Sequence, residues 1–270
     1  MSHWYNMDCD PHHTTIGANG KERATTLRDA KKHGYFPSVS TILGLLDKPS
    51  LQNWKFRQIT DACWGTPEDS HVCVDQDVYN KAMVKEAFDK VKDAQDVGTQ
   101  IHAALEHFFS GQEFDLEEKV VLPNETVAMK TFIKSVEKKL DQEDVTINAC
   151  ELRLVSQHEG YAGTTDAAIN RGVSRGILDF KTTKTKADTP VKPYPEQVMQ
   201  LAAYHMAHYG DIRTTDTAVN VYISTTEPGR VESHWYSAKE LVNAYFNGFI
   251  PLCKHWRYAK NYDPTLLTTK

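Results

Sequence analysis

The chain has 270 residues with a formal net charge of −5, and hydrophobic residues make up 40% of it. This composition is that of a globular protein with a sizeable core, and the length fits one α/β domain with additions. The negative charge does not exclude a nucleic-acid partner, because a binding groove requires only local positive charge. No apolar run approaches the roughly 18 residues that cross a bilayer, so we expect no membrane partner. Residues 1–10 resemble neither a signal nor a transit peptide, which predicts a cytoplasmic protein.

The cysteines are odd in number and irregularly spaced. They are Cys9, Cys63, Cys73, Cys150 and Cys253. No two form the closely spaced pairs that are typical of zinc sites and iron–sulfur proteins. The sequence therefore predicts free thiols in a reducing compartment and no iron–sulfur cluster.

Apolar residues at helical spacing dominate the first half of the chain. Gly34 is expected to end a helix at residues 26–32, and Ser38 or Ser40 to cap the short helix that follows. Asn124 is expected to cap a helix at residues 124–140. The predicted helices cover residues 26–32, a short stretch after residue 38, and residues 50–63, 77–94, 97–109 and 124–140. Residues 1–95 are therefore predicted to form a mostly helical N-terminal extension that packs on the core.

The pattern changes to alternating strands after residue 144. Predicted strands cover residues 149–156, 161–170, 176–182, 218–224 and 230–235, with a hairpin turn at residues 171–175. A helix is expected at residues 196–209, and Ser237 with Glu240 forms a capping box that opens a last helix to about residue 258. This order predicts an α/β fold in which residues 96–270 form a mixed central sheet flanked by helices, continuous with the extension as one structural domain.

An Asp-x-Lys pair lies in the third predicted strand. Asp179 and Lys181 are two residues apart, so their side chains share one face of the strand. Asp166 lies in the preceding strand, and antiparallel pairing can bring it beside Asp179. Adjacent carboxylates repel each other unless a cation lies between them, and oxygen ligands suit Mg²⁺. The alternative is a solvated surface pair, since Asp-x-Lys also occurs by chance.

A metal at this place would indicate phosphodiester chemistry. A bound divalent ion lowers the pKa of a water ligand and neutralises charge on a phosphate oxygen. Lys181 could then orient the attacking water or stabilise the developing charge.

Five segments form a longer pattern around these residues. In chain order they are GTQIH at residues 98–102, Glu151, GYAGTTD at residues 160–166, GILDFKT at residues 176–182 and QLAAY at residues 200–204. Together they resemble the RecB-like branch of the PD-(D/E)XK nuclease superfamily. PSVSTIL at residues 37–43, followed by Trp54, also resembles the start of phage-encoded exonucleases and of the mitochondrial genome maintenance exonuclease. The resemblance implies a restriction-endonuclease-like core.

The resemblance also implies a role for each matched position. Asp166 and Asp179 would be metal carboxylates, with the backbone carbonyl of Phe180 and the side chain of His102 as further ligands. Lys181 would be the catalytic lysine, and Glu151 either an outer metal ligand or a structural partner. Mg²⁺ is the implied cofactor, and Mn²⁺ can substitute for it.

Residues outside the metal centre are assigned to the substrate. Gln200 and Tyr204 are four residues apart on one helical face, so they can reach the same substrate. Lys184 and Lys186 are candidates for binding phosphates. Each has a structural alternative: His102 would be a core histidine, Gln200 and Tyr204 would pack the helix on the sheet, and the lysines would belong to a solvated loop.

Three functions are compatible with these residues. The first is a metal-dependent DNA exonuclease of replication, repair or recombination. If the enzyme is phage-encoded, it would act in the host cytoplasm. Its partners would be DNA, single-stranded or with a free end, and a replication or recombination protein. The second is an endonuclease of the same superfamily, and the third is a non-catalytic DNA-binding protein. Degenerate members usually lose a carboxylate or the lysine, and Asp166, Asp179 and Lys181 are all present here.

Overall fold

A computed structural model describes residues 3–47, 49–64, 75–122 and 125–267. Its contacts divide the chain into two units, one of Met1–Leu45 with Ala104–Lys270 and the other of Leu46–Ala103. This division differs from the predicted boundary at residue 95, because the first 45 residues fold with the sheet. Tyr5 and Phe36 are buried against Ala162, a residue of the sheet, which ties the N-terminal segment to it. This segment contains short strands beside short helices, whereas the longer helices α3 (Pro49–Trp64) and α4 (Gln76–Phe109) follow it.

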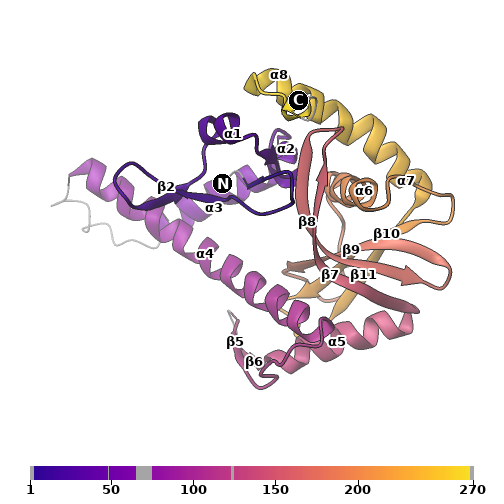
Figure 1. Ribbon diagram of the computed structural model, residues 1–270. Helices are drawn as coiled ribbons and strands as arrows, with labels where there is room; N and C mark the ends of the chain where they lie inside the picture. Colours follow the sequence, from indigo (N-terminus) through magenta and orange to yellow (C-terminus); the bar gives the residue numbers. More distant parts are fainter. Residues whose placement is uncertain (1–2, 48, 65–74, 123–124, 268–270) are drawn as a thin grey trace. The chain divides into compact units, whose positions relative to one another are not determined.

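A five-stranded mixed sheet forms the centre of the first unit (Figure 1). Its strand order is β11-β10-β9-β8-β7. Neighbouring strands are antiparallel except β9 and β10, which are parallel. The strands are β7 (Val145–Ser156), β8 (Tyr161–Arg171), β9 (Ser174–Thr183), β10 (Thr217–Ser224) and β11 (Val231–Ser237). The prediction of a mixed α/β fold with a central sheet is thus confirmed.

Helices cover both faces of this sheet. Helix α6 (Pro195–Tyr209) connects the parallel strands β9 and β10, and Figure 1 shows α5 (Met129–Gln142) on the opposite side of the sheet. Side chains on β9 point alternately to these two sides. Phe180 stacks on Phe109, at the end of α4 (Gln76–Phe109), with 6.3 Å between ring centroids, whereas the neighbouring Lys181 reaches α6. The sheet is therefore the middle of three layers.

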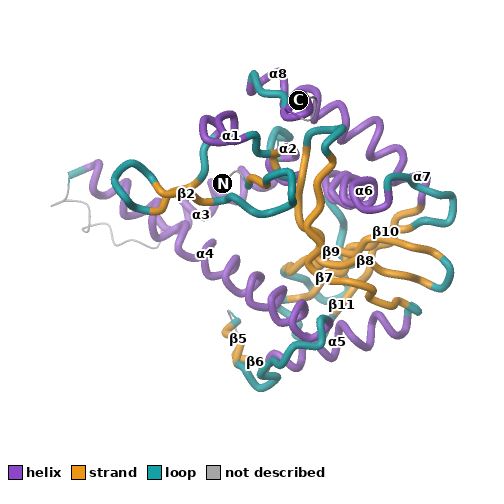
Figure 2. Tube along the Cα trace, in the orientation of Figure 1, coloured by secondary structure: helices purple, strands orange, loops and turns teal. Residues whose placement is uncertain are grey.

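Shorter elements complete the first unit (Figure 2). Three two-stranded ribbons pair β1 (Trp4–Tyr5) with β4 (Phe36–Pro37), β2 (Thr14–Ile16) with β3 (Glu22–Ala24), and β5 (Lys119–Val121) with β6 (Thr126–Ala128). The remaining helical segments of this unit are α1 (Leu27–His33), α2 (Val39–Leu43), α7 (Ala238–Asn243), the π-helix η2 (Ala244–Phe249), α8 (Ile250–Lys260) and the 3₁₀ helix η3 (Pro264–Leu267). Helix α3 (Pro49–Trp64) and most of α4 form the second unit.

The predicted caps are largely present. The hydroxyl of Ser38 accepts a hydrogen bond from the N–H of Thr41 at 3.0 Å and so caps α2. Ser237 and Glu240 form the expected capping box at α7. Gly34 ends α1 with a φ of 74°, in the left-handed region that glycine tolerates. Local sequence signals placed these helix ends correctly.

Four predicted helices differ in extent from the helices of the structure. Residues 77–94 and 97–109 belong to one continuous helix, α4, because no proline interrupts them and Gly98 is accommodated within it. Helix α5 begins at Met129, because Thr126–Ala128 pairs with Lys119–Val121 as a strand. The expected cap of that helix, Asn124, lies outside the described residues. The last predicted helix is divided into α7 and α8 by the π-helical turns of η2.

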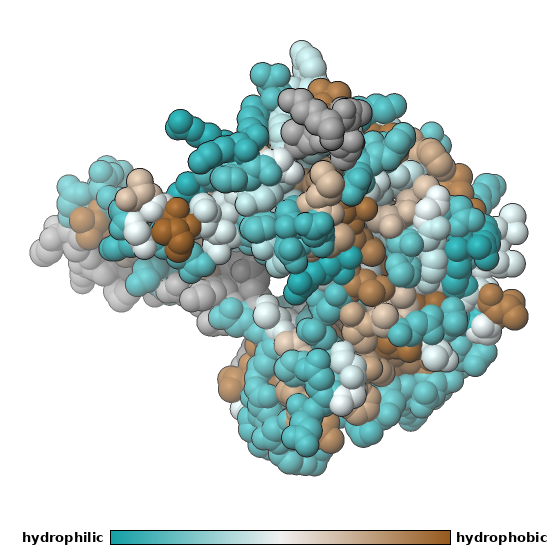
Figure 3. Space-filling model, viewed as in Figure 1, coloured by the Kyte–Doolittle hydropathy of each residue, from teal (hydrophilic) through white to brown (hydrophobic). Residues whose placement is uncertain are grey.

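Hydrophilic side chains cover most of the face drawn in Figure 3, and hydrophobic ones appear there in separate small groups. Isolated exposed apolar side chains are usual on globular proteins. Among the described residues, no helix combines the length and the apolar character that a membrane span requires.

Candidate active site

Asp179 and Lys181 form an ion pair on β9. The ammonium Nζ of Lys181 contacts Oδ2 of Asp179, and the two side chains are 27% and 6% exposed. Asp179 lies in a buried run of the strand that includes Ile177 and Leu178. A carboxylate in such surroundings is costly unless a cation or hydrogen-bond donors accompany it. The predicted same-face arrangement of the two residues is therefore present, and each neutralises the other.

Asp166 lies next to this pair because β8 and β9 stop pairing there. The last paired residues before the site are Ala167 and Leu178, and one further step of the register places Asp166 opposite Asp179. Instead of a backbone ladder at this step, Oδ2 of Asp166 accepts a hydrogen bond from the N–H of Phe180 at 2.6 Å. The Asp166 carboxylate is thus held against the Asp179–Lys181 segment of β9.

Glu151, on β7, lies beside Asp166 in the direction across the strands. Its neighbours Cys150 and Leu152 pair with Ala167 and Thr165, so the register places Glu151 level with Asp166. Glu151 is exposed and has a φ of 46°, although it lies inside a strand. A non-glycine residue in the left-handed region is strained, and such strain occurs most often at functional sites. This backbone feature makes Glu151 a member of the candidate site.

Helix α6 contacts the site through the two residues predicted from the QLAAY segment. Nζ of Lys181 donates to Oε1 of Gln200 at 3.2 Å, and Nε2 of Gln200 donates to the hydroxyl of Tyr204 at 3.3 Å. Tyr204 in turn lies on Gly163, where an added Cβ would come 2.7 Å from Cε1 of the Tyr204 ring. A glycine is therefore required at position 163 for α6 to approach β8 this closely.

The charges of the site alter the pKa of Lys181. Burial by itself would lower the pKa of its ammonium, but the attraction and hydrogen bond of Asp179, with a further attraction from Asp166, raise it above its ordinary value. Tyr204 responds to burial in the opposite way. Burial raises the pKa of its hydroxyl, the hydrogen bond with Gln200 opposes this, and the negative charge of Asp179 adds to it. A cationic lysine and a neutral tyrosine therefore line this side of the site.

Asn220, on β10, belongs to the site although we did not predict it. It pairs with Asp179 in the parallel register, is fully buried, and its Nδ2 donates to Oδ2 of Asp179 at 3.2 Å. The hydroxyl of Tyr236 donates to Oδ1 of Asn220 at 3.1 Å, which fixes which way the amide points. A signal for Asn220 was present in the sequence, because it interrupts the apolar run of β10 and a buried amide requires partners.

The oxygen atoms of this site fit a hard divalent cation. Asp166 and Asp179 supply carboxylates, and the carbonyl of Phe180 belongs to the residue between Asp179 and Lys181. Mg²⁺ is commonly bound by one or two carboxylates and completes its shell with water. Over the described residues, no three or more side chains of His, Cys, Asp and Glu gather as a ready-made metal site. Any ion here would therefore depend on backbone and water oxygens in addition to the two carboxylates.

His102 is not assigned to this cluster. It is half-buried on α4 in the Leu46–Ala103 unit, whereas Asp166 and Asp179 belong to the other unit. Its role as a metal ligand remains a prediction from the GTQIH segment.

Lys184 and Lys186 lie on the loop of residues 184–194, which joins β9 to α6. Both are exposed, and among the described residues neither ammonium takes part in an ion pair or a hydrogen bond. Thr185 between them is turned inward, where its N–H donates to Oγ1 of Thr226 at 2.9 Å. The loop therefore presents two uncompensated cations a few residues after Lys181.

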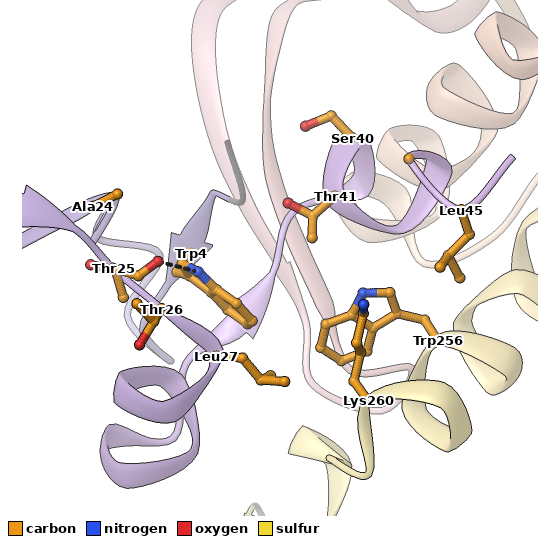
Figure 4. Close-up of a pocket in the computed structure, with 11 residues that line it drawn as sticks. Trp4, Ala24, Thr25, Thr26, Leu27, Ser40, Thr41, Leu45, Trp256 and Lys260 are labelled. Atoms are coloured by element: carbon orange, nitrogen blue, oxygen red, sulfur yellow. Dashed lines mark hydrogen bonds between the residues drawn. The ribbon is translucent and has the colours of Figure 1, made fainter. Parts of the chain in front are cut away.

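A cavity of about 480 Å³ lies elsewhere in the same unit and contains none of the predicted site residues (Figure 4). Trp4 and Trp256 line it, but they are only 1% and 2% exposed, so they offer little surface to a ligand. The hydroxyl of Thr25, also in the lining, is buried without a hydrogen-bond partner within the described part of the chain. The two indole rings therefore offer little surface for stacking in this cavity.

Comparisons with known proteins leave the family undetermined. No family model matches the chain, and no curated protein matches it. Among solved structures, the chain is similar to one titled "Crystal structure of SSO0001", with 16% identity and a TM-score of 0.24. The match covers 43% of this chain and 57% of that chain. A likeness at this level carries no argument about fold or function.

Proposed function

We propose that this chain is a divalent-metal-dependent DNA nuclease with a PD-(D/E)XK-type core of the RecB-like branch, acting as an exonuclease in replication, repair or recombination. The observation that carries the proposal is the meeting of Asp166, Asp179 and Lys181 at the point where β8 and β9 stop pairing. Two carboxylates and a lysine converge there on the internal strands β8 and β9, and Gln200 of α6 accepts a hydrogen bond from the lysine. Such a group supports hydrolysis better than it supports a purely structural role.

The carboxylates of Asp166 and Asp179, with the carbonyl of Phe180, would hold the metal. When bound, a divalent ion supplies Lewis-acid stabilisation of a phosphate oxygen and a more acidic water. Glu151 lies level with Asp166 in the register and would act as an outer carboxylate. His102 is proposed as a further ligand on the basis of the GTQIH segment alone.

The chain's own side chains have definite tasks in this scheme. Lys181, as an ammonium, donates hydrogen bonds to a phosphate oxygen or to the attacking water and stabilises the charge that develops in the transition state. Gln200 holds that ammonium from α6, and Tyr204 holds Gln200. Asn220 holds the Asp179 carboxylate from the other side. This arrangement pre-organises the charged groups before the substrate binds.

Digestion of end-labelled single- and double-stranded linear DNA with Mg²⁺ tests the proposal. We expect wild-type protein to release label and Asp179→Asn to lose cleavage by at least about a hundredfold while it remains folded. Asp141→Asn, which changes an exposed aspartate of α5, is the matched control and should cleave normally. Full activity in EDTA would contradict the metal requirement. Binding of DNA with no cleavage in Mg²⁺ or Mn²⁺ would indicate the non-catalytic alternative.

Closed circular DNA distinguishes the two nuclease versions. An exonuclease requires an end and leaves the circle intact, whereas an endonuclease of the same superfamily nicks or linearises it. Mixing labelled linear and closed circular DNA in one reaction provides an internal control for metal and enzyme concentration.

A further inference from the structure

The loop of residues 184–194 is fastened to the β10–β11 hairpin along its length. Thr185 anchors its start: besides its N–H bond to Thr226, its carbonyl accepts a hydrogen bond from Oγ1 of Thr226 at 2.9 Å. The hydroxyl of Thr185 also lies 2.6 Å from Oγ of Ser224. Further along, the N–H of Val191 donates to Oε2 of Glu232 at 2.9 Å. These hydrogen bonds hold the loop in a defined path.

Arg230 is the centre of this attachment. Its Nη1 donates to the carbonyl of Lys186 at 2.9 Å, and its Nη2 donates to the carbonyl of Thr189 at 2.6 Å. Its Nε donates to Oε1 of Glu232 at 2.9 Å, and its Nη1 also pairs with Glu227 at 2.6 Å. The side chain is 24% exposed. A planar guanidinium can serve two carbonyls and two carboxylates at once, which a lysine ammonium cannot do in this geometry.

The charges on this loop are distributed unevenly. Glu227 and Glu232 together carry one negative charge more than Arg230 neutralises, so Arg230 itself adds no positive field outside the loop. Within the described residues, three lysines of this loop take part in no ion pair or side-chain hydrogen bond: Lys184, Lys186 and Lys192. Lys184 and Lys186 lie on either side of the inward-pointing Thr185. Free lysines on a restrained backbone lose less entropy on binding than lysines on a mobile one. They are therefore suited to bind anions that repeat along a chain.

We propose that Arg230 is a positioning residue for substrate binding, which fixes residues 184–194 so that Lys184 and Lys186 bind phosphates of the DNA strand that enters the site. This inference rests on the proposed function. Arg230 does not touch the substrate, and its effect passes through the backbone carbonyls of Lys186 and Thr189. The lysines contribute affinity that depends on salt, because each neutralised phosphate releases a counterion.

The test compares cleavage kinetics and the salt dependence of DNA binding in wild type, Arg230→Gln and the double variant Lys184→Gln/Lys186→Gln. We expect Arg230→Gln to raise KM for DNA about tenfold with kcat within about twofold, and to make the slope of log K against log salt shallower by about 1–2. In the double-lysine background, Arg230→Gln should have no further effect on KM, because its partners in binding are already lost. Arg230→Lys should not restore the wild-type KM.

Arg23→Gln is the matched control. Arg23 makes a comparable paired contact with Asp29, at 2.7 and 2.9 Å, on a different part of the unit, and its loss should leave KM and the salt slope unchanged. Thermal unfolding of each variant shows whether it is folded at the assay temperature. A wild type that cleaves DNA while Arg230→Gln keeps its KM and salt slope overturns this inference and leaves the proposed function standing. A wild type that neither binds nor cleaves DNA overturns both.

Discussion

The ammonium of Lys181 and the carboxylate of Asp179 are in contact although both belong to the same strand, two residues apart. Side chains at this spacing share a face of the sheet, and their contact is completed from both sides by Asn220 and Gln200. The pair is therefore part of a network and is not an isolated surface contact. Removing any member should change the others in a predictable direction.

Lys181→Met should lower stability as well as activity. Asp179 is buried and would lose the ammonium that it contacts, so the unfolding free energy should fall by roughly 1–3 kcal/mol in metal-free buffer. Lys134→Met, which removes an exposed ion pair with Glu137, should change it by less than about 1 kcal/mol. Urea unfolding followed by circular dichroism measures both. Equal small changes would mean that the Lys181–Asp179 contact contributes nothing to the fold.

Asn220→Leu should lower the apparent affinity for Mg²⁺ more than it lowers the stability of the fold. The variant leaves Asp179 without its amide donor, and loss of a group that orients a metal ligand typically costs about 10–100-fold in metal affinity or activity. We expect the Mg²⁺ concentration for half-maximal cleavage to rise by this factor. Tyr236→Phe, which removes only the hydroxyl that orients Asn220, should give a smaller rise. An unchanged Mg²⁺ requirement in Asn220→Leu would count against the role of Asn220.

Gly163→Ala should destabilise the protein because of a steric conflict with Tyr204. The added Cβ would stand 2.7 Å from the Tyr204 ring, a distance that requires α6 or β8 to shift. Overpacking of this kind costs roughly 1–3 kcal/mol. Gly210→Ala is a useful comparison, because Gly210 has open space around it and only its φ of +75° opposes a side chain. Thermal unfolding should show the larger loss for Gly163→Ala, accompanied by weaker cleavage.

His205 should make stability depend on pH between about 4 and 6.5. It is fully buried, and burial, opposed by attraction to Asp216, lowers its pKa from 6.5 to about 4. In this window the unfolded chain binds a proton that the folded chain does not, so the unfolding free energy falls as the pH decreases. The loss amounts to roughly 3 kcal/mol at most.

Chemical unfolding at pH 7, 6, 5 and 4 measures the His205 effect. His205→Leu should flatten the dependence above pH 4, whereas His158→Gln, at an exposed position, should leave it as in wild type. The same slope in His205→Leu and wild type would assign the titration to another group.

Helix ends and strand positions followed closely from the sequence. Gly34, Ser38 and the Ser237–Glu240 capping box act through neighbours only a few residues away, so their effects could be read from local sequence. The pairing of Asp179 with Lys181 on one face is also a local property of a strand.

Elements whose boundaries or attachment depend on residues distant in the sequence were predicted less well. The start of α5 depends on pairing between Lys119–Val121 and Thr126–Ala128, and the attachment of residues 1–45 depends on contacts of Tyr5 and Phe36 with Ala162.

The sequence by itself determined which residues form the centre of the candidate site, because Asp166, Asp179 and Lys181 are placed by strand alternation and by a short turn. Only the tertiary structure decided how they are held. Asn220 comes from a strand more than forty positions later in the chain, joined by parallel pairing across α6, and Arg230 reaches back to residues 184–194 from the last hairpin. Such contacts arise from the register of non-adjacent segments, which packing of the whole sheet sets and local sequence does not encode.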